Sequence, residues 1–359
     1  MAAGLGVFVE VLGIFSAAME IFNFGQDNFG SKEEDFIGST IKIAVALDGG
    51  ALSGAGGDLP DVRLFNEFGV FLGIKSDPGV VETGEVGVIK VTHNNALKQQ
   101  APYTLFSAND NAICIAMASI TWPDGNQWGW IGDWGRQCNG AWYFSNVFLQ
   151  GMSRQPFCMW IDANGDMPHT GFQIHWPDFA PTVPPSLRAP EDTTGTPLTP
   201  DDLCNSGPPF ELRTDSDPKD VLIALPRNQR SKRRQQAGQR VELPAEARIR
   251  RRAANSTASG ERGAPWYRQQ LVVDYSLERS ARMLCESKSS QGPDFASYSE
   301  RLFCRMSDKT LWKFCGGKRT ADCYSPESQR LVVSGALGAL SSEKYAKVVT
   351  WNKPAKTDG

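Results

Sequence analysis

The sequence is poor in histidine and lacks the short motifs of several common catalytic sites. Only 3 of its 359 residues are histidine. It contains no Gly-x-Ser-x-Gly elbow, no phosphate-binding P-loop, no His-Glu-x-x-His motif and no dinucleotide-binding fingerprint. The sequence therefore identifies no catalytic residue and no cofactor, so an enzymatic role is uncertain and a non-enzymatic one is favoured.

Cys-x-x-Cys pairs are also absent, although the chain has 8 cysteines. Structural zinc sites usually need such closely spaced ligands, and the histidines lie far from the cysteine clusters, so we favour disulfide bonds over zinc ligands or reduced thiols. Disulfides persist in oxidising compartments and indicate an extracellular, secreted protein. The cysteines are Cys114, Cys138, Cys158, Cys204, Cys285, Cys304, Cys315 and Cys323.

The spacing of the cysteines predicts bridges within each half of the chain. Near the C-terminus, Cys285–Cys304 and Cys315–Cys323 is the most economical pairing, because it closes short loops. We expect the other four cysteines to pair among themselves, in an order that the sequence leaves open.

The N-terminus lacks both the positive charge of a convincing signal peptide and the length of a firm membrane span. The first basic residue is Lys32, and Glu10 and Glu20 interrupt the apolar residues 5–24. Residues 1–36 are a poor signal peptide, the remnant of a longer N-terminus or an amphipathic helix, and we favour the last two. The apolar face of that helix would carry Leu5, Phe8, Leu12, Phe15, Met19 and Phe22.

The rest of the chain is predicted to be mainly β. Residues 37–180 contain many short β-branched or aromatic segments, which are separated by turn-forming Gly, Pro, Asn and Asp. Strands at this spacing, without helical patterns between them, predict an antiparallel β-sandwich. This region is acidic, since residues 1–180 carry 8 Lys and Arg against 19 Asp and Glu.

Residues 181–264 are predicted to be a flexible linker that is first proline-rich and then basic. Within it, residues 227–263 have too few large apolar side chains to offset their chain entropy, so we expect disorder and protease access there. The basic run is read as a solvated linker, with proteolytic processing and a nuclear signal as alternatives, and no nucleic-acid partner is expected. Asn255 starts an Asn-Ser-Thr glycosylation sequon in this stretch.

Residues 265–359 are predicted to form a small α+β unit stapled by disulfides, because so short a segment builds a weak core alone. Ser276 is predicted to cap a helix that carries Leu277, Ala281 and Leu284 on one face. The segments 301–306 and 310–315 are predicted to form a hairpin.

Tryptophan is the most concentrated residue type, since seven of the 10 lie between positions 122 and 176. Flat indole faces beside Asn, Gln and Asp suit sugar rings, whose faces stack while their hydroxyls find polar partners. A cell-wall polysaccharide or surface glycan is therefore a candidate ligand, and a Trp-filled sandwich core is the alternative explanation. The candidate ligand-binding residues are Trp122, Trp128, Trp130 and Trp134.

Two acidic groups are weaker candidates for chemistry. Asp162, Asn164 and Asp166 alternate as in the first part of a calcium loop, but the later ligands are missing and an Asx-rich turn explains the same residues. Asp124 and Asp133 offer the two carboxylates of a carbohydrate-active hydrolase, which is the alternative to a binding protein. Spacing alone does not fix the distance between them.

Several segments resemble an uncharacterised family of cysteine-containing secreted proteins of filamentous fungi. The resemblance covers most of the chain apart from residues 1–36 and the basic linker. It implies a secreted protein and supplies no catalytic residues. The segments are Gly56-Gly57-Asp58-Leu59-Pro60-Asp61-Val62-Arg63, Asp110-Asn111-Ala112-Ile113-Cys114, Gly132-Asp133-Trp134, Trp160-Ile161-Asp162-Ala163-Asn164-Gly165-Asp166, Leu284-Cys285-Glu286-Ser287, Gly292-Pro293-Asp294-Phe295 and Phe303-Cys304-Arg305-Met306.

Overall fold

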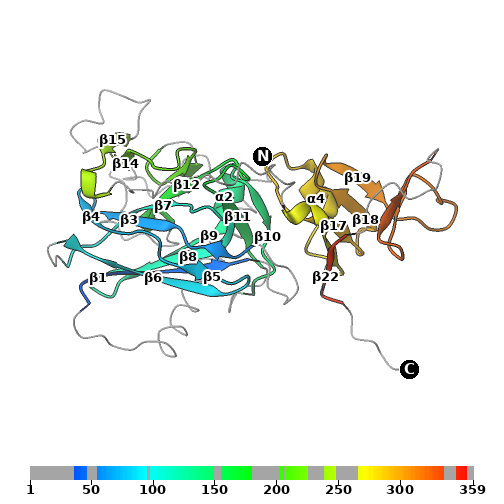
Figure 1. Ribbon diagram of the computed structural model, residues 1–359, viewed down its shortest axis with the longest axis horizontal. Coiled ribbons are helices and arrows are strands. Elements are labelled where there is room, and N and C mark those ends of the chain that lie inside the picture. The colour runs from blue at the N-terminus through cyan, green and yellow to red at the C-terminus, as the bar shows by residue number, and fades with distance from the viewer. Residues whose placement is uncertain are drawn as a thin grey trace, which may run out of the picture.

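The computed structural model shows a chain that is mainly β, with several antiparallel sheets and few short helices. Figure 1 shows a larger body, coloured blue to green, beside a smaller one, coloured yellow to red. We call them the N-terminal unit (residues 36–247) and the C-terminal unit (residues 266–353). No helix in the described part of the chain is long and apolar enough to cross a membrane. The structure describes residues 36–46, 55–94, 98–148, 155–179, 203–204, 207–224, 238–247, 266–334 and 345–353.

Two antiparallel sheets build the N-terminal unit. The six-stranded sheet has the order β10-β11-β8-β1-β6, with β9 paired to β8. Its strands are β1 (Gly38–Val45), β6 (Val86–Thr92), β8 (Ile113–Thr121), β9 (Gln127–Ile131), β10 (Trp142–Phe144) and β11 (Phe157–Ile161). The five-stranded sheet has the order β13-β12-β7-β3-β4. Its strands are β3 (Asp61–Phe65), β4 (Phe71–Lys75), β7 (Tyr103–Ser107), β12 (Gly171–His175) and β13 (Phe210–Arg213).

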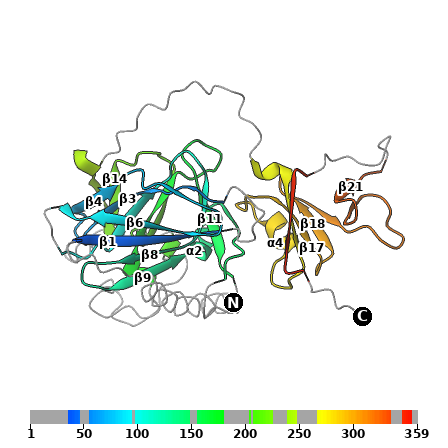
Figure 2. The ribbon, with the colours of Figure 1, turned by 60° about the horizontal axis from the view of Figure 1, so that its bottom comes forward.

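The two sheets lie in layers and share one apolar core (Figures 1 and 2). The ring of Trp130 on β9 stacks on Phe172 of β12 with 5.0 Å between centroids. At one side the edge strands β4 and β6 meet so closely that a Cβ on Gly73 would lie 2.3 Å from the Thr92 carbonyl oxygen. Short elements connect or flank the strands: β2 (Gly57–Asp58), β5 (Val80–Val81), α2 (Gly132–Gln137) and η2 (Trp176–Phe179).

Part of the predicted linker 181–264 is ordered, so that prediction is wrong for the strands within it. Besides β13, it contains β14 (Asp220–Ala224), β15 (Gly238–Glu242) and η4 (Ala245–Ala247). The β14–β15 hairpin covers the outer face of the five-stranded sheet, where both Val221 and Ile223 are buried. Residue Asn255 and most of residues 227–263 lie outside the described residues, as does the N-terminal segment 1–35.

Buried polar side chains explain why this hairpin is held in place. The Gln173 amide on β12 accepts a hydrogen bond from the Leu222 N–H and donates one to the Leu222 carbonyl. Arg63 on β3 is wholly buried and donates to the Ala247 carbonyl, to Ser107 and to the Asp217 carboxylate. These hydrogen bonds offset the free-energy cost of burying the polar atoms of Gln173 and Arg63. The partners are distant in the sequence, so amino-acid composition alone does not reveal them.

The C-terminal unit is a mixed sheet with the order β19-β18-β17-β16-β22, in which β16 runs parallel to both neighbours. The predicted hairpin is confirmed, because β18 and β19 pair antiparallel. The helix α4 packs near β18, and Tyr324 of β20 stacks on Phe303 from the other face. The elements are η5 (Trp266–Gln269), β16 (Gln270–Asp274), α4 (Ala281–Glu286), β17 (Asp294–Ser297), β18 (Leu302–Arg305), β19 (Thr310–Lys313), β20 (Cys323–Ser325), β21 (Arg330–Val332) and β22 (Lys347–Trp351).

The predicted helix begins later than its sequence pattern suggests. Its N-cap is Ser280, not Ser276, and the Ser280 hydroxyl accepts a hydrogen bond from the Met283 N–H at 3.0 Å. The Glu300 carboxylate accepts the Ala281 N–H and so satisfies a second orphan donor of the first turn. Leu277 is therefore outside the helix and 91% exposed, whereas Ala281 and Leu284 are buried.

All eight cysteines form disulfides within the two units, as the sequence predicts. Cys285–Cys304 and Cys315–Cys323 are confirmed. In the N-terminal unit the bridges are Cys114–Cys158 and Cys138–Cys204.

The two units pack against each other through strands β10 and β11. The Tyr143 hydroxyl donates to the Pro293 carbonyl at 2.9 Å, and the Trp160 indole donates to the Gln291 carbonyl at 2.9 Å. The Phe144 ring lies 5.1 Å from that of Phe295 on β17. One apolar core therefore continues from the sheets of the N-terminal unit into the C-terminal unit.

Candidate functional site

The tryptophan cluster is core, so the hypothesis of an exposed Trp platform is wrong. Trp122, Trp130 and Trp134 are 2%, 0% and 4% exposed, and Trp128 is half-buried beside Trp122 at 5.2 Å. Trp128 and Trp130 share one face of β9, and this face points inward between the two sheets. The Trp122 indole also donates to the Ala101 carbonyl at 3.1 Å, which satisfies its polar atom inside the core.

Asp124 and Asp133 do not form the carboxylate pair of a hydrolase. Asp124 lies in the exposed turn before β9, where it accepts hydrogen bonds from Gln100 and Asn126 that lower its pKa against the opposing effect of burial. Asp133 follows β9, is buried and accepts the Phe157 N–H at 3.1 Å. The five residues of β9 lie between the two aspartates and span roughly 13 Å. The two carboxyl groups of a glycoside hydrolase lie no more than ~10 Å apart.

The Asp162 loop forms the Asx-rich turn that was the alternative to a calcium site. The Asp162 carboxylate accepts the N–H groups of Gly165 and Asp166 at 2.9 and 2.7 Å, and burial raises the pKa of this carboxyl. Asn164 donates to the Asp110 carbonyl. One carboxylate oxygen of Asp162 and the amide oxygen of Asn164, which accepts the Asp166 N–H at 3.2 Å, therefore serve the turn itself. No group of three or more His, Cys, Asp or Glu side chains within the described ranges could hold a metal ion.

His175 is a buried histidine that contacts two carboxylates. Its Nδ1 lies 2.7 Å from Asp178 and its Nε2 lies 3.1 Å from Glu67. Burial alone would lower the pKa of this imidazole, but the Asp178 carboxylate and its neighbours hold it well above 6.5. The side chain is only 5% exposed, so this histidine ties the β3–β4 turn to η2 and offers no room for a ligand.

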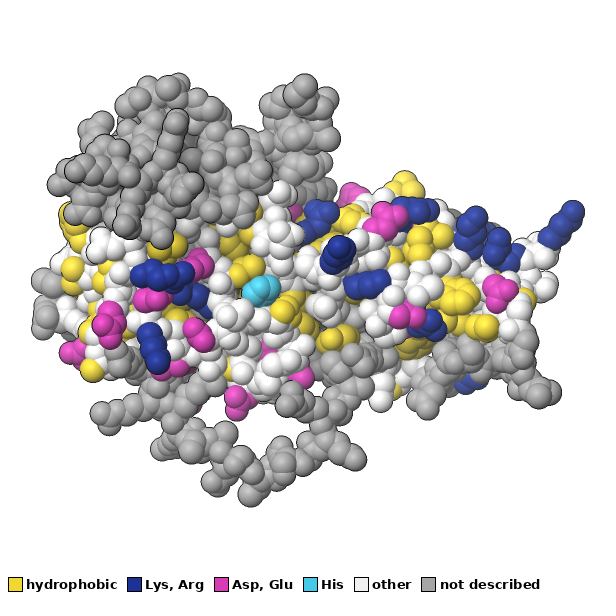
Figure 3. Space-filling model, turned by 90° about the horizontal axis from the view of Figure 1, so that it is seen from above, with side chains coloured by type: hydrophobic (Ala, Val, Ile, Leu, Met, Phe, Trp, Pro, Cys, Tyr) yellow, Lys and Arg dark blue, Asp and Glu magenta, His cyan; other side chains and the backbone are white. Residues whose placement is uncertain are grey.

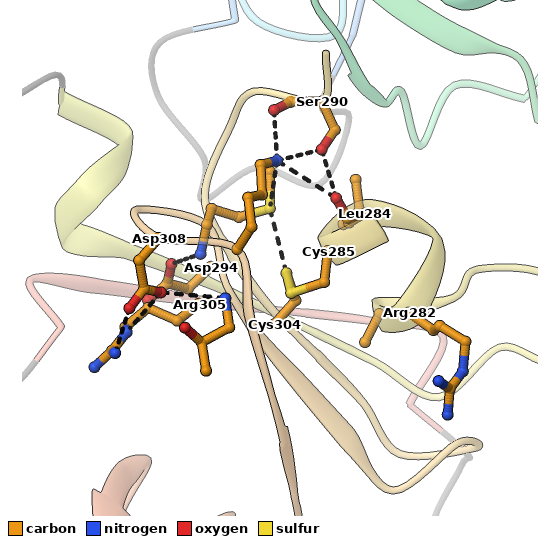
Figure 4. Close-up of a disulfide and its surroundings, with 12 residues drawn as sticks. Arg282, Leu284, Cys285, Ser290, Asp294, Cys304, Arg305 and Asp308 are labelled. Atoms are coloured by element: carbon orange, nitrogen blue, oxygen red, sulfur yellow. Dashed lines mark hydrogen bonds and ion pairs between the residues drawn. A yellow bond between two sulfur atoms is a disulfide. The ribbon is translucent and has the colours of Figure 1, made fainter. Parts of the chain in front are cut away.

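Lys309 and Ser290 resemble a nucleophile and its base but form a structural contact. Lys309 Nζ donates to the Ser290 carbonyl at 2.6 Å and contacts the Ser290 hydroxyl, and burial lowers the pKa of this lysine to about 8. Ser290 is wholly buried and donates its proton to the Leu284 carbonyl at 2.6 Å. Figure 4 shows Ser290 and Leu284 beside the Cys285–Cys304 disulfide. The Lys309 and Ser290 side chains both donate to the Leu284 carbonyl near the end of α4, and the Ser290 hydroxyl is buried.

Asp294, in the same region (Figure 4), makes stability depend on pH. Burial raises the pKa of this carboxyl to about 6, although hydrogen bonds from Tyr345 and the Met306 N–H oppose the change. A carboxyl whose folded-state pKa exceeds its unfolded value of 3.8 favours folding at low pH, and this contribution is lost as the pH rises through 6.

We therefore expect Asp294→Asn to remove part of the pH dependence of folding. The asparagine keeps the oxygen that accepts the Met306 N–H but cannot ionise. Urea unfolding of the wild type should give about 1 kcal/mol more stability at about pH 5 than at about pH 7.5 from this group, and the variant should lack that difference. Equal pH dependence in the two proteins would show that Asp294 does not titrate in this range.

A pocket lies at the outer end of the C-terminal unit. Its volume is about 230 Å³, and it is lined by Tyr298, Arg301, Phe314, Cys315, Pro326 and Glu327. We call it the Tyr298 pocket. Three segments form its walls: the β17–β18 turn, the chain after β19 and the β20–β21 turn. Figure 2 shows the β20–β21 region at the end of the molecule farthest from the sheets of the N-terminal unit.

Local structure fixes these three segments relative to one another. Arg301 has φ 54°, a left-handed turn conformation, and its carbonyl accepts the Phe314 N–H at 3.0 Å. The Cys315 N–H donates to the Tyr324 carbonyl at 2.8 Å, and the Cys315–Cys323 disulfide closes the intervening loop. The pocket is therefore a product of backbone contacts between segments that no short motif marks.

The pocket combines aromatic surface with two charges of opposite sign. The Tyr298 ring stacks on Tyr275 at 4.2 Å and meets the Phe314 ring edge-on at 5.2 Å. Burial, followed by the hydrogen bond with Tyr275, raises the pKa of Tyr298 to about 12, so its hydroxyl stays protonated at neutral pH. Arg301 supplies fixed donors and Glu327 supplies an acceptor, and both are exposed. Such a pocket can stack a ring and bind its polar substituents.

Comparisons with known proteins suggest no function for this pocket. No protein-family model matches the chain. No curated protein matches it either.

Proposed function

We propose that the protein is a secreted, non-enzymatic binding protein whose Tyr298 pocket holds one ring of a glycan. A cell-wall polysaccharide or surface glycan is the proposed partner. The observation that carries the proposal is the pocket itself. In it the edge-on rings of Tyr298 and Phe314 lie beside two charged side chains, Arg301 and Glu327.

The architecture supports a secreted binding protein. Four disulfides are typical of proteins that fold in an oxidising compartment. We interpret the two layered antiparallel sheets of the N-terminal unit as a β-sandwich, a scaffold that commonly carries recognition surfaces on attached elements. In this interpretation the N-terminal unit supports the C-terminal unit through their shared core.

The size and chemistry of the pocket support a sugar ring. A volume of about 230 Å³ lies below the roughly 300–1,000 Å³ of drug-sized sites, so it fits a ligand of single-ring size. Sugar rings present an apolar face for aromatic stacking and hydroxyls for polar side chains. Among the residues that the structure describes, Glu327 is the one carboxylate that lines the pocket, whereas glycoside hydrolysis normally uses two. Binding is therefore favoured over hydrolysis.

Replacing the stacking ring tests the proposal. Tyr298→Ala removes the half-buried aromatic ring and should weaken retention on insoluble cell-wall polysaccharide roughly fivefold, because a stacking contact contributes on the order of 1 kcal/mol beyond area burial. Tyr298→Phe keeps the ring and should keep most of the binding. Trp128→Ala, in the N-terminal unit, should leave binding unchanged.

Folding of each variant is checked by circular dichroism before binding is compared. A folded Tyr298→Ala protein with wild-type retention would contradict a binding site at this pocket. If Trp128→Ala lost binding while Tyr298→Ala kept it, the ligand would bind to the N-terminal unit.

A further inference from the structure

The two charged side chains of the Tyr298 pocket do not neutralise each other. Arg301 and Glu327 line the same pocket, yet they form no ion pair. Over the part of the chain that the structure describes, the Arg301 guanidinium has no hydrogen-bond or ion-pair partner, whereas Glu327 accepts a hydrogen bond from the Ser325 hydroxyl at 3.1 Å. An exposed, unpaired guanidinium beside aromatic rings is a ready partner for a carboxylate.

The position of Arg301 is set by the backbone and not by a partner. The residue lies in the β17–β18 turn with φ 54°, and its Nη2 lies close to the Gly316 backbone, where an added Cβ would be 3.2 Å away. The absence of a side chain at Gly316 therefore leaves room for the guanidinium at the rim of the pocket. The planar fork of arginine can then bind both oxygens of a carboxylate.

The surroundings of the pocket are also cationic. Lys313 at the end of β19 and Lys318 and Arg319 in the Cys315–Cys323 loop are all exposed. Figure 3 shows Lys and Arg side chains gathered at the end of the molecule where the C-terminal unit lies. A surface of this sign raises the local concentration of anionic ligands and steers them toward the site.

We infer that the ligand of the Tyr298 pocket is an acidic sugar, a uronic acid residue of a polysaccharide. Its ring stacks on Tyr298, its carboxylate binds the Arg301 guanidinium and one of its hydroxyls donates to Glu327. This inference rests on the proposed glycan-binding function and adds the chemical class of the sugar. Arg301 is the residue that selects the acid over its neutral counterpart.

Two trisaccharides that differ only in the carboxylate test the inference: a trimer of galacturonic acid and the matching trimer of galactose. Titration of the full chain by calorimetry should show about tenfold tighter binding of the acidic trimer, because charge-assisted hydrogen bonds are roughly twice as strong as neutral ones. Arg301→Gln should remove this preference, whereas Arg301→Lys should keep part of it. Raising the salt concentration should reduce it as well.

The matched control is Arg282→Gln, an exposed arginine on α4 that pairs with Glu286, and it should bind both trimers as the wild type does. Equal binding of both trimers by the wild type, or an unchanged preference in Arg301→Gln, would overturn the inference and leave the glycan proposal standing. Failure of the wild type to bind either trimer or any cell-wall polysaccharide would overturn both.

Discussion

Replacing Trp130 by alanine should lower the free energy of unfolding by about 3–5 kcal/mol, the range for removing a large aromatic side chain from a core. Trp130 is fully buried on β9, and its ring stacks on Phe172 at 5.0 Å and on Phe210 at 6.0 Å, both from the five-stranded sheet. Its removal leaves a cavity between the two layers, which rigid sheets cannot close.

Urea unfolding of the variant measures this loss directly. Phe148→Ala is the matched control, because Phe148 is a large side chain that is 74% exposed, and its loss should change stability by less than about 0.5 kcal/mol. A Trp130→Ala protein with near wild-type stability would mean that this face of β9 is not core, and the exposed-platform hypothesis would return.

Removing the Cys138–Cys204 disulfide should destabilise the chain more than removing Cys315–Cys323. The paired cysteines are 66 and 8 residues apart. Chain-entropy arguments give about 4 kcal/mol for the longer loop and about 2.5 kcal/mol for the shorter one, because the longer bridge restricts the unfolded chain more. The change in each case is a double substitution of both cysteines by alanine.

The two double variants differ in a second respect. The Cys315–Cys323 bridge closes a wall of the Tyr298 pocket, so its removal should weaken glycan binding even when the protein stays folded. The Cys138–Cys204 variant should bind normally at temperatures where it is folded. A larger stability loss at the short loop, or intact binding without the Cys315–Cys323 bridge, would contradict this division of roles.

The strands and the disulfide pairs near the C-terminus could be predicted from the sequence because both depend on local information. Alternating apolar segments and turn residues mark strands such as β6, whose side chains are alternately exposed and buried. The same alternation does not say which face is inward. Trp128 and Trp130 share a face of β9 in either case, and only the opposing sheet decides that this face is core.

The ordered part of the linker and the Tyr298 pocket could not be predicted, because both depend on partners distant in the sequence. Four of the five residues of β14 are apolar, but the place of the hairpin depends on distant residues, because Gln173 and Arg63 on the sheet beneath hold it. The pocket needs two turns and the chain after β19, which are distant in the sequence and meet only in the folded C-terminal unit. The left-handed Arg301 and the Cys-Gly-Gly sequence at 315–317 are local signals of turns, and neither indicates a ligand.

Amide hydrogen exchange of the full chain, with and without the galacturonic acid trimer, tests the central claim most directly. It reports where a ligand protects the backbone without any substitution. The proposed site predicts slower exchange at residues 298–301 and 314–327 on binding, and no change at residues 122–134. Protection at residues 122–134, with none around the Tyr298 pocket, would contradict the account.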